Sequence, residues 1–100
     1  MWMLADINKG LAECRSTEGA LLIDVREPEE YASGHIPGAV NVPLSSFDGA
    51  GLPRDRALFL YCQRGIRSAR AAARLKKRGY GNVKSIGGIA KYRGENGSVH

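Results

Sequence analysis

The sequence predicts an α/β fold, in which a small parallel β-sheet has helices on both of its faces. The first observation is that short apolar runs alternate with segments that have helical features, which is the pattern of a parallel sheet. The second is the length, because one hundred residues leave too little chain for a second hydrophobic core. Ligands of such sheets bind beyond the carboxyl ends of the strands. The runs that we expect to be strands are residues 20–25, 39–44, 57–62 and 82–86.

The composition is that of an ordinary soluble globular protein, with 43% hydrophobic and 25% charged residues. No apolar run approaches the roughly 18 residues that a membrane-spanning helix needs. The first residues, MWMLADINKG, lack the basic segment followed by an apolar segment that marks a secretory signal. We therefore expect a cytoplasmic protein that does not contact a membrane.

The N-terminal segment has the spacing of a short helix. Apolar side chains recur at helical intervals in residues 4–15, and Asp6 stands near the start, where it can cap the helix. On such a helix Cys14 is a small apolar side chain on a buried face, which is the usual role of a free cysteine. The apolar positions are Leu4, Ile7, Leu11 and Cys14.

A buried strand and a short helix follow. The run ALLIDV, residues 20–25, is almost entirely apolar, which is typical of a strand buried on both faces. The segment EPEEYASG, residues 27–34, favours a short helix because Pro28 suits a first turn, acidic residues favour that end, and Gly34 can end the helix. The next run, AVNVPL, predicts a second strand that stops at Pro43.

The second half of the chain repeats the alternation. Residues 45–55, SSFDGAGLPRD, are rich in turn formers and predict a loop. The run ALFLYC, residues 57–62, is the most hydrophobic of the expected strands. The run NVKSI predicts the fourth strand, and GGIAKYRG, residues 87–94, predicts one more helical turn.

A helix over residues 66–78, ended by Gly79, is predicted to have one basic and one apolar arc. Lys76 falls among the apolar positions, which fits only if its stem lies along the surface and its ammonium group reaches water. The predicted basic arc is Arg67, Arg70, Arg74, Lys77 and Arg78, and the predicted apolar arc is Ile66, Ala69, Ala72, Ala73 and Leu75.

The net charge of +5 is unevenly distributed along the chain. Residues 1–61 hold 5 Lys and Arg against 9 Asp and Glu, whereas residues 62–100 hold 10 against 1. A basic segment can bind nucleic acid, but no aromatic residues are interleaved with these charges and no nucleic-acid motif is present. We therefore expect a small anionic substrate and no nucleic acid. A solvated helix face is the plainer alternative.

The motif that carries chemistry is Cys62, where the most hydrophobic strand meets QRGIR and a helix. The first N–H groups of a helix have no internal partners, and with the helix dipole they form an anion site. Gly65 permits a tight loop, and Arg64 and Arg67 add positive charge. Such surroundings lower a thiol pKa from about 8.5 into the range of roughly 3.5–7.5, which predicts a thiolate nucleophile. The alternative is a small core residue at the end of a strand.

The two cysteines do not suggest a metal site. Neither Cys14 nor Cys62 is part of a CxxC pair or a cluster with histidine, and His35 and His100 stand alone. A disulfide between the cysteines is disfavoured in a reducing cytoplasm.

The ordered motifs of the chain resemble one family. The segments LLIDVREPEEYASGHIPGAVNVPL and LFLYCQRGIRSARAAARLKKRGYGNVKSIGGI resemble the single-domain rhodaneses, which are thiosulfate sulfurtransferases. The resemblance covers about residues 20–89, so we expect one rhodanese domain over residues 1–100. It implies a rhodanese-like parallel sheet flanked by helices, and no metal or organic cofactor.

The resemblance also implies roles for single residues. Cys62 matches the catalytic cysteine that takes up sulfane sulfur as a persulfide, and Arg67 matches an arginine that closes the loop and can meet an anion. Asp24 matches a carboxylate that helps to hold the active-site region, although a cap or a surface ion pair is an equal alternative. His35 is expected to be structural, and Tyr92 to replace an aromatic residue of the family. The backbone amides expected to cradle the substrate are those of Gln63, Arg64, Gly65, Ile66 and Arg67.

The expected reaction is a ping-pong transfer of sulfur from thiosulfate, or a related donor, to a thiophilic acceptor such as cyanide, a small thiol or an acceptor protein. Two alternatives remain open. One is a related cysteine-dependent phosphatase or arsenate reductase, and the other is a sulfur-carrier or protein-docking module. The loop length favours sulfur, because four residues separate Cys62 from Arg67 whereas cysteine phosphatases that resemble this site have five.

Overall fold

The computed structural model describes residues 5–47 and 51–94 and has the predicted α/β architecture. All strand pairs are parallel, and the sheet order is β2-β1-β3-β4. The elements in chain order are α1 (Ile7–Arg15), β1 (Leu21–Asp24), α2 (Pro28–Ala32), β2 (Val40–Asn41), the 3-10 helix η1 (Leu44–Ser46), β3 (Leu58–Cys62), α3 (Ile66–Lys77), β4 (Val83–Gly88) and the 3-10 helix η2 (Ile89–Lys91).

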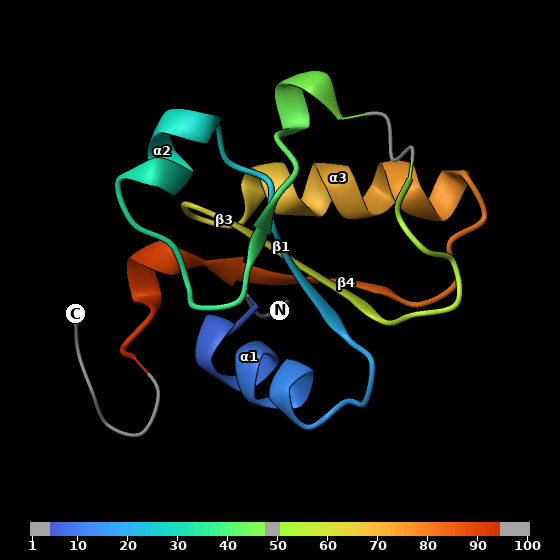
Figure 1. Ribbon diagram of the computed structural model, residues 1–100, viewed down its shortest axis with the longest axis horizontal. Coiled ribbons are helices and arrows are strands. Elements are labelled where there is room, and N and C mark those ends of the chain that lie inside the picture. The colour runs from blue at the N-terminus through green and yellow to red at the C-terminus, as the bar shows by residue number, and fades with distance from the viewer. Residues whose placement is uncertain (1–4, 48–50, 95–100) are drawn as a thin grey trace, which may run out of the picture.

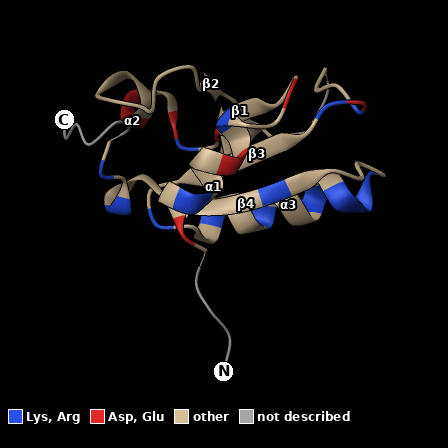
Figure 2. Ribbon diagram, turned by 90° about the horizontal axis from the view of Figure 1, so that it is seen from below, with Lys and Arg blue, Asp and Glu red and all other residues tan. Residues whose placement is uncertain are grey.

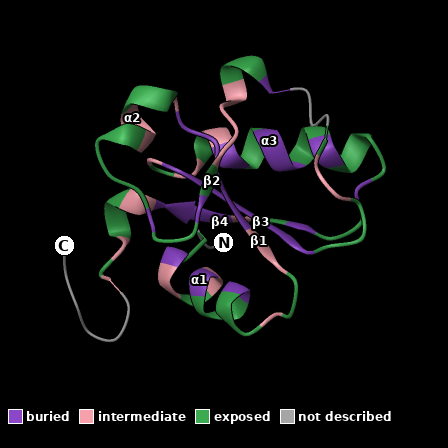
Figure 3. Ribbon diagram, viewed as in Figure 1, coloured by how far each residue is buried: buried purple, intermediate pink, exposed green. Residues whose placement is uncertain are grey.

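Helices cover both faces of the sheet, as predicted, with α1 below it and α3 above it in Figure 1. Strand β3 lies in the middle and is buried along its whole length (Figure 3). Successive side chains of a strand point to opposite faces. Accordingly Leu60 and Cys62 pack on the α3 side with Leu75, whereas Phe59 and Tyr61 pack in the cluster on the α1 side. Cys62 thus ends a central strand and faces the basic helix.

Helix α1 has the predicted cap and buried face. The Asp6 carboxylate accepts hydrogen bonds from the N–H groups of Asn8, at 3.0 Å, and Lys9, at 3.4 Å. Cys14 is buried, as expected, together with Ile7 and Leu11. Leu4, which the helical spacing also included, lies outside the described residues.

The second strand is shorter than predicted. Only Val40 and Asn41 of residues 39–44 form a strand, although the N–H groups of Val42 and Leu44 still donate to the carbonyls of Asp24 and Val25. Pro43 between them has no N–H to donate, and the chain then turns into η1. Strand β4 is longer than predicted and reaches Gly88, which pairs with Cys62.

The predicted apolar arc of α3 is partly wrong. Ala72 and Leu75 are buried, but Ala69 and Ala73 are exposed and Ile66 is 67% exposed. The buried positions are Ser68, Ala71, Ala72 and Leu75. These positions are three or four residues apart, which is one face of a helix. An alanine-rich helix has little hydrophobic contrast, and its polar Ser68 is buried because its hydroxyl has partners there.

The charge pattern of α3 is nearer to the prediction. Figure 2 shows basic residues spaced along this helix, and Arg70, Arg74 and Lys77 are exposed. Lys76 is exposed as well, so it does not interrupt the packed face. Within residues 5–47 and 51–94, no helix has the length and hydrophobicity needed to cross a membrane.

Candidate active site

The Cys62 sulfur lies inside the loop that joins β3 to α3. Its Sγ accepts hydrogen bonds from the N–H groups of Gly65, at 2.9 Å, and Ser68, at 3.4 Å. The Ser68 hydroxyl lies 3.6 Å from the same sulfur. Cys62 is only 1% exposed, so these protein groups take the place of most of the water around the sulfur. Backbone donors therefore surround the Cys62 sulfur, and one of them, the N–H of Ser68, was not among the predicted amides of residues 63–67.

This environment acts on the thiol in two opposite ways. Burial raises the pKa of the Cys62 thiol, because a charged sulfur loses hydration. Hydrogen bonds from the N–H and hydroxyl of Ser68 and from the N–H groups of Gly65 and Arg64 lower it. The hydrogen bonds outweigh burial, so the pKa is lower than that of an ordinary thiol. The direction is the one that the sequence predicted.

Two glycines allow the loop to take this shape. Gly65 has a φ of 109°, in the left-handed region that favours glycine. Gly88 lies across from the loop, and a Cβ atom there would overlap the carbonyl oxygen of Gln63. The same carbonyl accepts a hydrogen bond of 3.1 Å from the N–H of Ala90. The loop is thus packed directly on the end of β4, a contact that the sequence analysis did not anticipate.

Asp24 is buried and reaches the loop through a second residue. It forms an ion pair with Arg26 at 2.8 Å, and the two residues are 0% and 5% exposed. Arg26 in turn donates from Nη1 to the side-chain oxygen of Gln63 at 3.3 Å. A surface ion pair, one of the alternatives for Asp24, does not match this buried geometry, and the role of Asp24 in holding the active-site region stays a prediction. The sequence analysis missed Arg26, although the motif DVRE contains it.

Arg67 is held by a residue that the sequence analysis also missed. Its guanidinium donates to both carboxylate oxygens of Glu30 on α2, at 2.7 and 3.0 Å. Hydrogen bonds from Arg67 and the backbone of Glu27 lower the pKa of Glu30 to about 2. The expectation that Arg67 closes the loop and meets an anion stays a prediction, but its guanidinium is already anchored to α2.

A small hollow of about 230 Å³ opens above the sulfur. It is lined by Cys62, Gln63, Arg64, Ile66 and Arg67, which are the predicted catalytic residue and four of the five predicted binding residues. Gly65 contributes its N–H to the sulfur instead. Asp24 takes no part in the lining. His35 lies apart from the loop, stacked on Tyr31 with ring centroids 3.8 Å apart. Among the described residues, no group of three or more His, Cys, Asp or Glu could hold a metal ion.

The comparison with protein families agrees with this geometry, because the model of the rhodanese-like domain matches residues 5–95. The chain belongs to the rhodanese-like family. Among curated relatives, it is 44% identical over 79 residues to the uncharacterized protein YqhL of Bacillus subtilis. It is 43% identical over 76 residues to a protein of Allochromatium vinosum named sulfurtransferase. These matches cover 76% and 73% of this chain, but 63% and 71% of the relatives.

Solved structures, one of them named a rhodanese, share the fold. A rhodanese with anions from E. coli is 33% identical, with a TM-score of 0.64 over 72% of this chain and 89% of that one. The protein SSP1007 of Staphylococcus saprophyticus is 25% identical, with a TM-score of 0.76 over 99% of this chain and 100% of that one. The rhodanese-like architecture that the resemblance implied is confirmed.

Proposed function

We propose that this rhodanese-like chain is a sulfurtransferase that takes sulfane sulfur from thiosulfate and carries it as a Cys62 persulfide. The observation that carries this proposal is the Cys62 sulfur, which accepts hydrogen bonds from Gly65 and Ser68 inside its own loop. A thiolate stabilised in this way needs no neighbouring base to become a nucleophile. The relative named sulfurtransferase supports the same class of reaction.

In the first step the Cys62 thiolate attacks the outer sulfur of thiosulfate. A bond forms between Sγ and that sulfur, the S–S bond of thiosulfate breaks, and sulfite leaves with the bonding electron pair. The loop N–H groups that surround the thiolate then face the new persulfide. Preorganised N–H donors stabilise negative charge without reorganising during the reaction.

The hollow above the sulfur suits a small anion at this step. Arg64 contributes to its lining and, among the described residues, has no ion-pair or hydrogen-bond partner for its guanidinium. A free cation close to the nucleophile draws an anionic donor to the site. The charge of Arg67, by contrast, is already paired with that of Glu30.

In the second step an acceptor such as cyanide or a thiolate attacks the outer sulfur of the persulfide. The bond between Sγ and the outer sulfur breaks, and Cys62 leaves as the thiolate, which restores the enzyme. The acceptor keeps the sulfur atom, as thiocyanate or as a new persulfide. The cycle balances without a redox cofactor or metal.

The main alternative enzyme class acts on phosphate or arsenate. Four residues separate Cys62 from Arg67, which gives a smaller ring of N–H groups than the five-residue loop of cysteine phosphatases. The smaller ring favours one sulfur atom over a tetrahedral oxyanion.

A sulfur-carrier role is the other alternative, and a Bacillus subtilis relative at 37% identity is named a putative sulfur carrier protein. That role would use the same persulfide and differ in the acceptor.

The experiment is a comparison of two activities in one preparation. We expect thiosulfate:cyanide sulfurtransferase activity and negligible hydrolysis of an aryl phosphate. Cys62→Ser should abolish sulfur transfer, and Cys14→Ser is the matched control, because Cys14 is buried in α1 away from the loop. Hydrolysis of the aryl phosphate that depends on Cys62, without sulfur transfer, would replace the proposal with the phosphatase alternative.

A further inference from the structure

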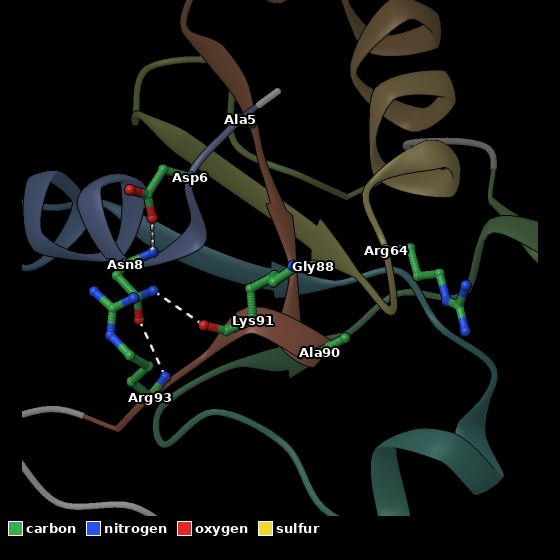
Figure 4. A pocket seen from close by; sticks show the side chains of 8 residues that line it. All are labelled: Ala5, Asp6, Asn8, Arg64, Gly88, Ala90, Lys91 and Arg93. Atoms are coloured by element: carbon green, nitrogen blue, oxygen red, sulfur yellow. Dashed lines mark hydrogen bonds between the residues drawn. The ribbon is translucent and has the colours of Figure 1, made fainter. Parts of the chain in front are cut away.

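A second hollow, which the reaction above does not use, lies beside the Cys62 loop. Its volume is about 490 Å³, and it opens between the start of α1, the end of β4 and η2 (Figure 4). Small nonpolar residues, Ala5, Gly88 and Ala90, form part of its lining. The volume lies within the roughly 300–1,000 Å³ range of small-molecule sites. Cyanide would not need a space of this size.

The hollow is joined to the catalytic loop by Arg64, which lines both it and the smaller hollow above the sulfur. Because Arg64 is two residues from Cys62, their Cα atoms are at most about 7 Å apart. The loop is also fixed to this side of the molecule by the hydrogen bond from the Ala90 N–H to the Gln63 carbonyl. Gly88, which also lines the hollow, pairs with Cys62 between β3 and β4, so a molecule in the hollow lies close to the catalytic loop.

The rim of the hollow is mainly cationic. Arg64, Lys91 and Arg93 lie on it with a single carboxylate, that of Asp6. The Asp6 carboxylate is occupied as the cap of α1, where the hydrogen bond from the Asn8 N–H lowers its pKa and the charge of Arg93 lowers it further. Within residues 5–47 and 51–94, neither Arg64 nor Lys91 has an ion-pair or hydrogen-bond partner for its charged group. Two uncompensated cations remain for a ligand.

The backbone of Lys91 and Arg93 is held in place by Asn8. Its side-chain nitrogen donates to the carbonyl of Lys91 at 3.0 Å, and its oxygen accepts from the N–H of Arg93 at 3.2 Å. Figure 4 shows these three residues together on one side of the hollow and Arg64 on the other. Lys91 and Arg93 therefore place positive charge on one side of the hollow, whereas the Arg64 guanidinium points away from them in this view.

We propose that this hollow, the acceptor pocket, binds a small thiol that bears carboxylates and presents it to the Cys62 persulfide. The inference deepens the proposed function and rests on it. The carboxylates lie against Lys91, and the thiol reaches past Arg64 to the smaller hollow. Its thiolate attacks the outer sulfur, the bond from that sulfur to Sγ breaks, and the Cys62 thiolate leaves. The product is the persulfide of the small thiol.

The test uses preformed Cys62 persulfide and two forms of one acceptor, glutathione and its diethyl ester, in which both carboxylates are blocked. Lys91→Gln should lower kcat/KM for glutathione about threefold to fivefold, the range of a partly exposed ion pair. The same variant should leave the diethyl ester and the rate of persulfide formation from thiosulfate unchanged. Lys77→Gln, on the exposed end of α3, is the control and should change neither acceptor. Equal losses for both acceptors, or no loss for glutathione, would overturn the proposal.

A binding measurement separates this inference from the sulfur chemistry. S-Methylglutathione cannot accept sulfur, so its binding to the wild-type protein, followed by NMR titration, does not depend on any reaction. We expect saturable shifts at Ala5, Asn8 and Ala90, and weaker binding to Lys91→Gln and Arg64→Gln. Such binding without persulfide formation would leave the pocket standing and refute the proposed function. Persulfide formation without saturable binding would refute the pocket and point to a protein segment as the acceptor.

Discussion

Arg67 in the first turn of α3 and Glu30 on α2 are joined by two hydrogen bonds, at 2.7 and 3.0 Å. The two residues are 37 positions apart, and Arg67 ends the loop that surrounds the Cys62 sulfur. The pair therefore ties the catalytic loop to a helix that contributes no reacting group.

Glu30→Gln should weaken this tie. The side chains of the pair are 32% and 34% exposed, so we expect a loss of about 0.5–1 kcal/mol in the free energy of unfolding at pH 7. Glutamine keeps an oxygen for the N–H of Glu27, which isolates the charge effect. Urea denaturation measures the loss, and Glu29→Gln on the exposed side of α2 is the control.

The same pair predicts a pH dependence. The folded-state pKa of Glu30, about 2, lies below its ordinary value of 4.5, so its contribution is complete above the ordinary value. It is lost as the pH falls from about 4.5 to about 2. The stability difference between wild type and Glu30→Gln should therefore shrink across this window. A difference that stayed constant at pH 2 would contradict the assignment.

Ser68→Ala should raise the pKa of the Cys62 thiol, because the hydroxyl that stabilises the thiolate is removed. Ser85→Ala should raise it less, since the Ser85 hydroxyl lies 2.7 Å from that of Ser68 and acts on the sulfur only through it. The rate of alkylation by iodoacetamide as a function of pH measures the thiol pKa. Ser16→Ala, on the exposed end of α1, is the control. Unchanged profiles in both test variants would show that these hydroxyls only fill space.

Asp24→Asn should destabilise the fold by about 3–5 kcal/mol, because it leaves the buried Arg26 guanidinium without its counter-charge. Combining Asp24→Asn with Arg26→Met removes the uncompensated charge, so part of the lost stability should return. Activity should not return with it, since Gln63 loses its contact with Arg26. Thermal unfolding and sulfurtransferase assays on both variants make the comparison. A double variant with full activity would refute a role for this contact.

Gly88→Ala should clearly lower the rate of persulfide formation from thiosulfate, while the free energy of unfolding changes little. The added Cβ would overlap the Gln63 carbonyl and push the loop away from β4. Gly81→Ala is the matched control, because a Cβ at Gly81 meets no atom within 4 Å. Equal activity in the two variants would mean that the loop does not depend on its approach to β4.

The sequence predicted what is local in the chain. The strand, the cysteine and the loop amides follow one another within residues 58–68, so the nest around the sulfur could be expected from the order of residue types alone. The helix cap at Asp6 and the burial of Cys14 were predictable for the same reason. The supporting contacts were not, because Glu30 meets Arg67, and Arg26 meets Gln63, across 37 residues that the fold brings together.

The packed face of α3 shows a different limit. Alanine is tolerated in both buried and exposed positions, so periodicity alone could not distinguish Ala71, which is buried, from Ala69 and Ala73, which are exposed. Ser68 resembles a surface residue in sequence, and its burial follows from hydroxyl contacts with Cys62 and Ser85. Polar residues at functional sites break the hydrophobic pattern on which such predictions depend.

The central claim is that Cys62 carries sulfane sulfur, and intact mass spectrometry after incubation with thiosulfate tests it most directly. The account predicts that wild type and Cys14→Ser each gain the mass of one sulfur atom, that cyanide removes it, and that Cys62→Ser gains nothing. A wild-type protein that gains no sulfur, or a Cys62→Ser protein that still gains it, would contradict the account.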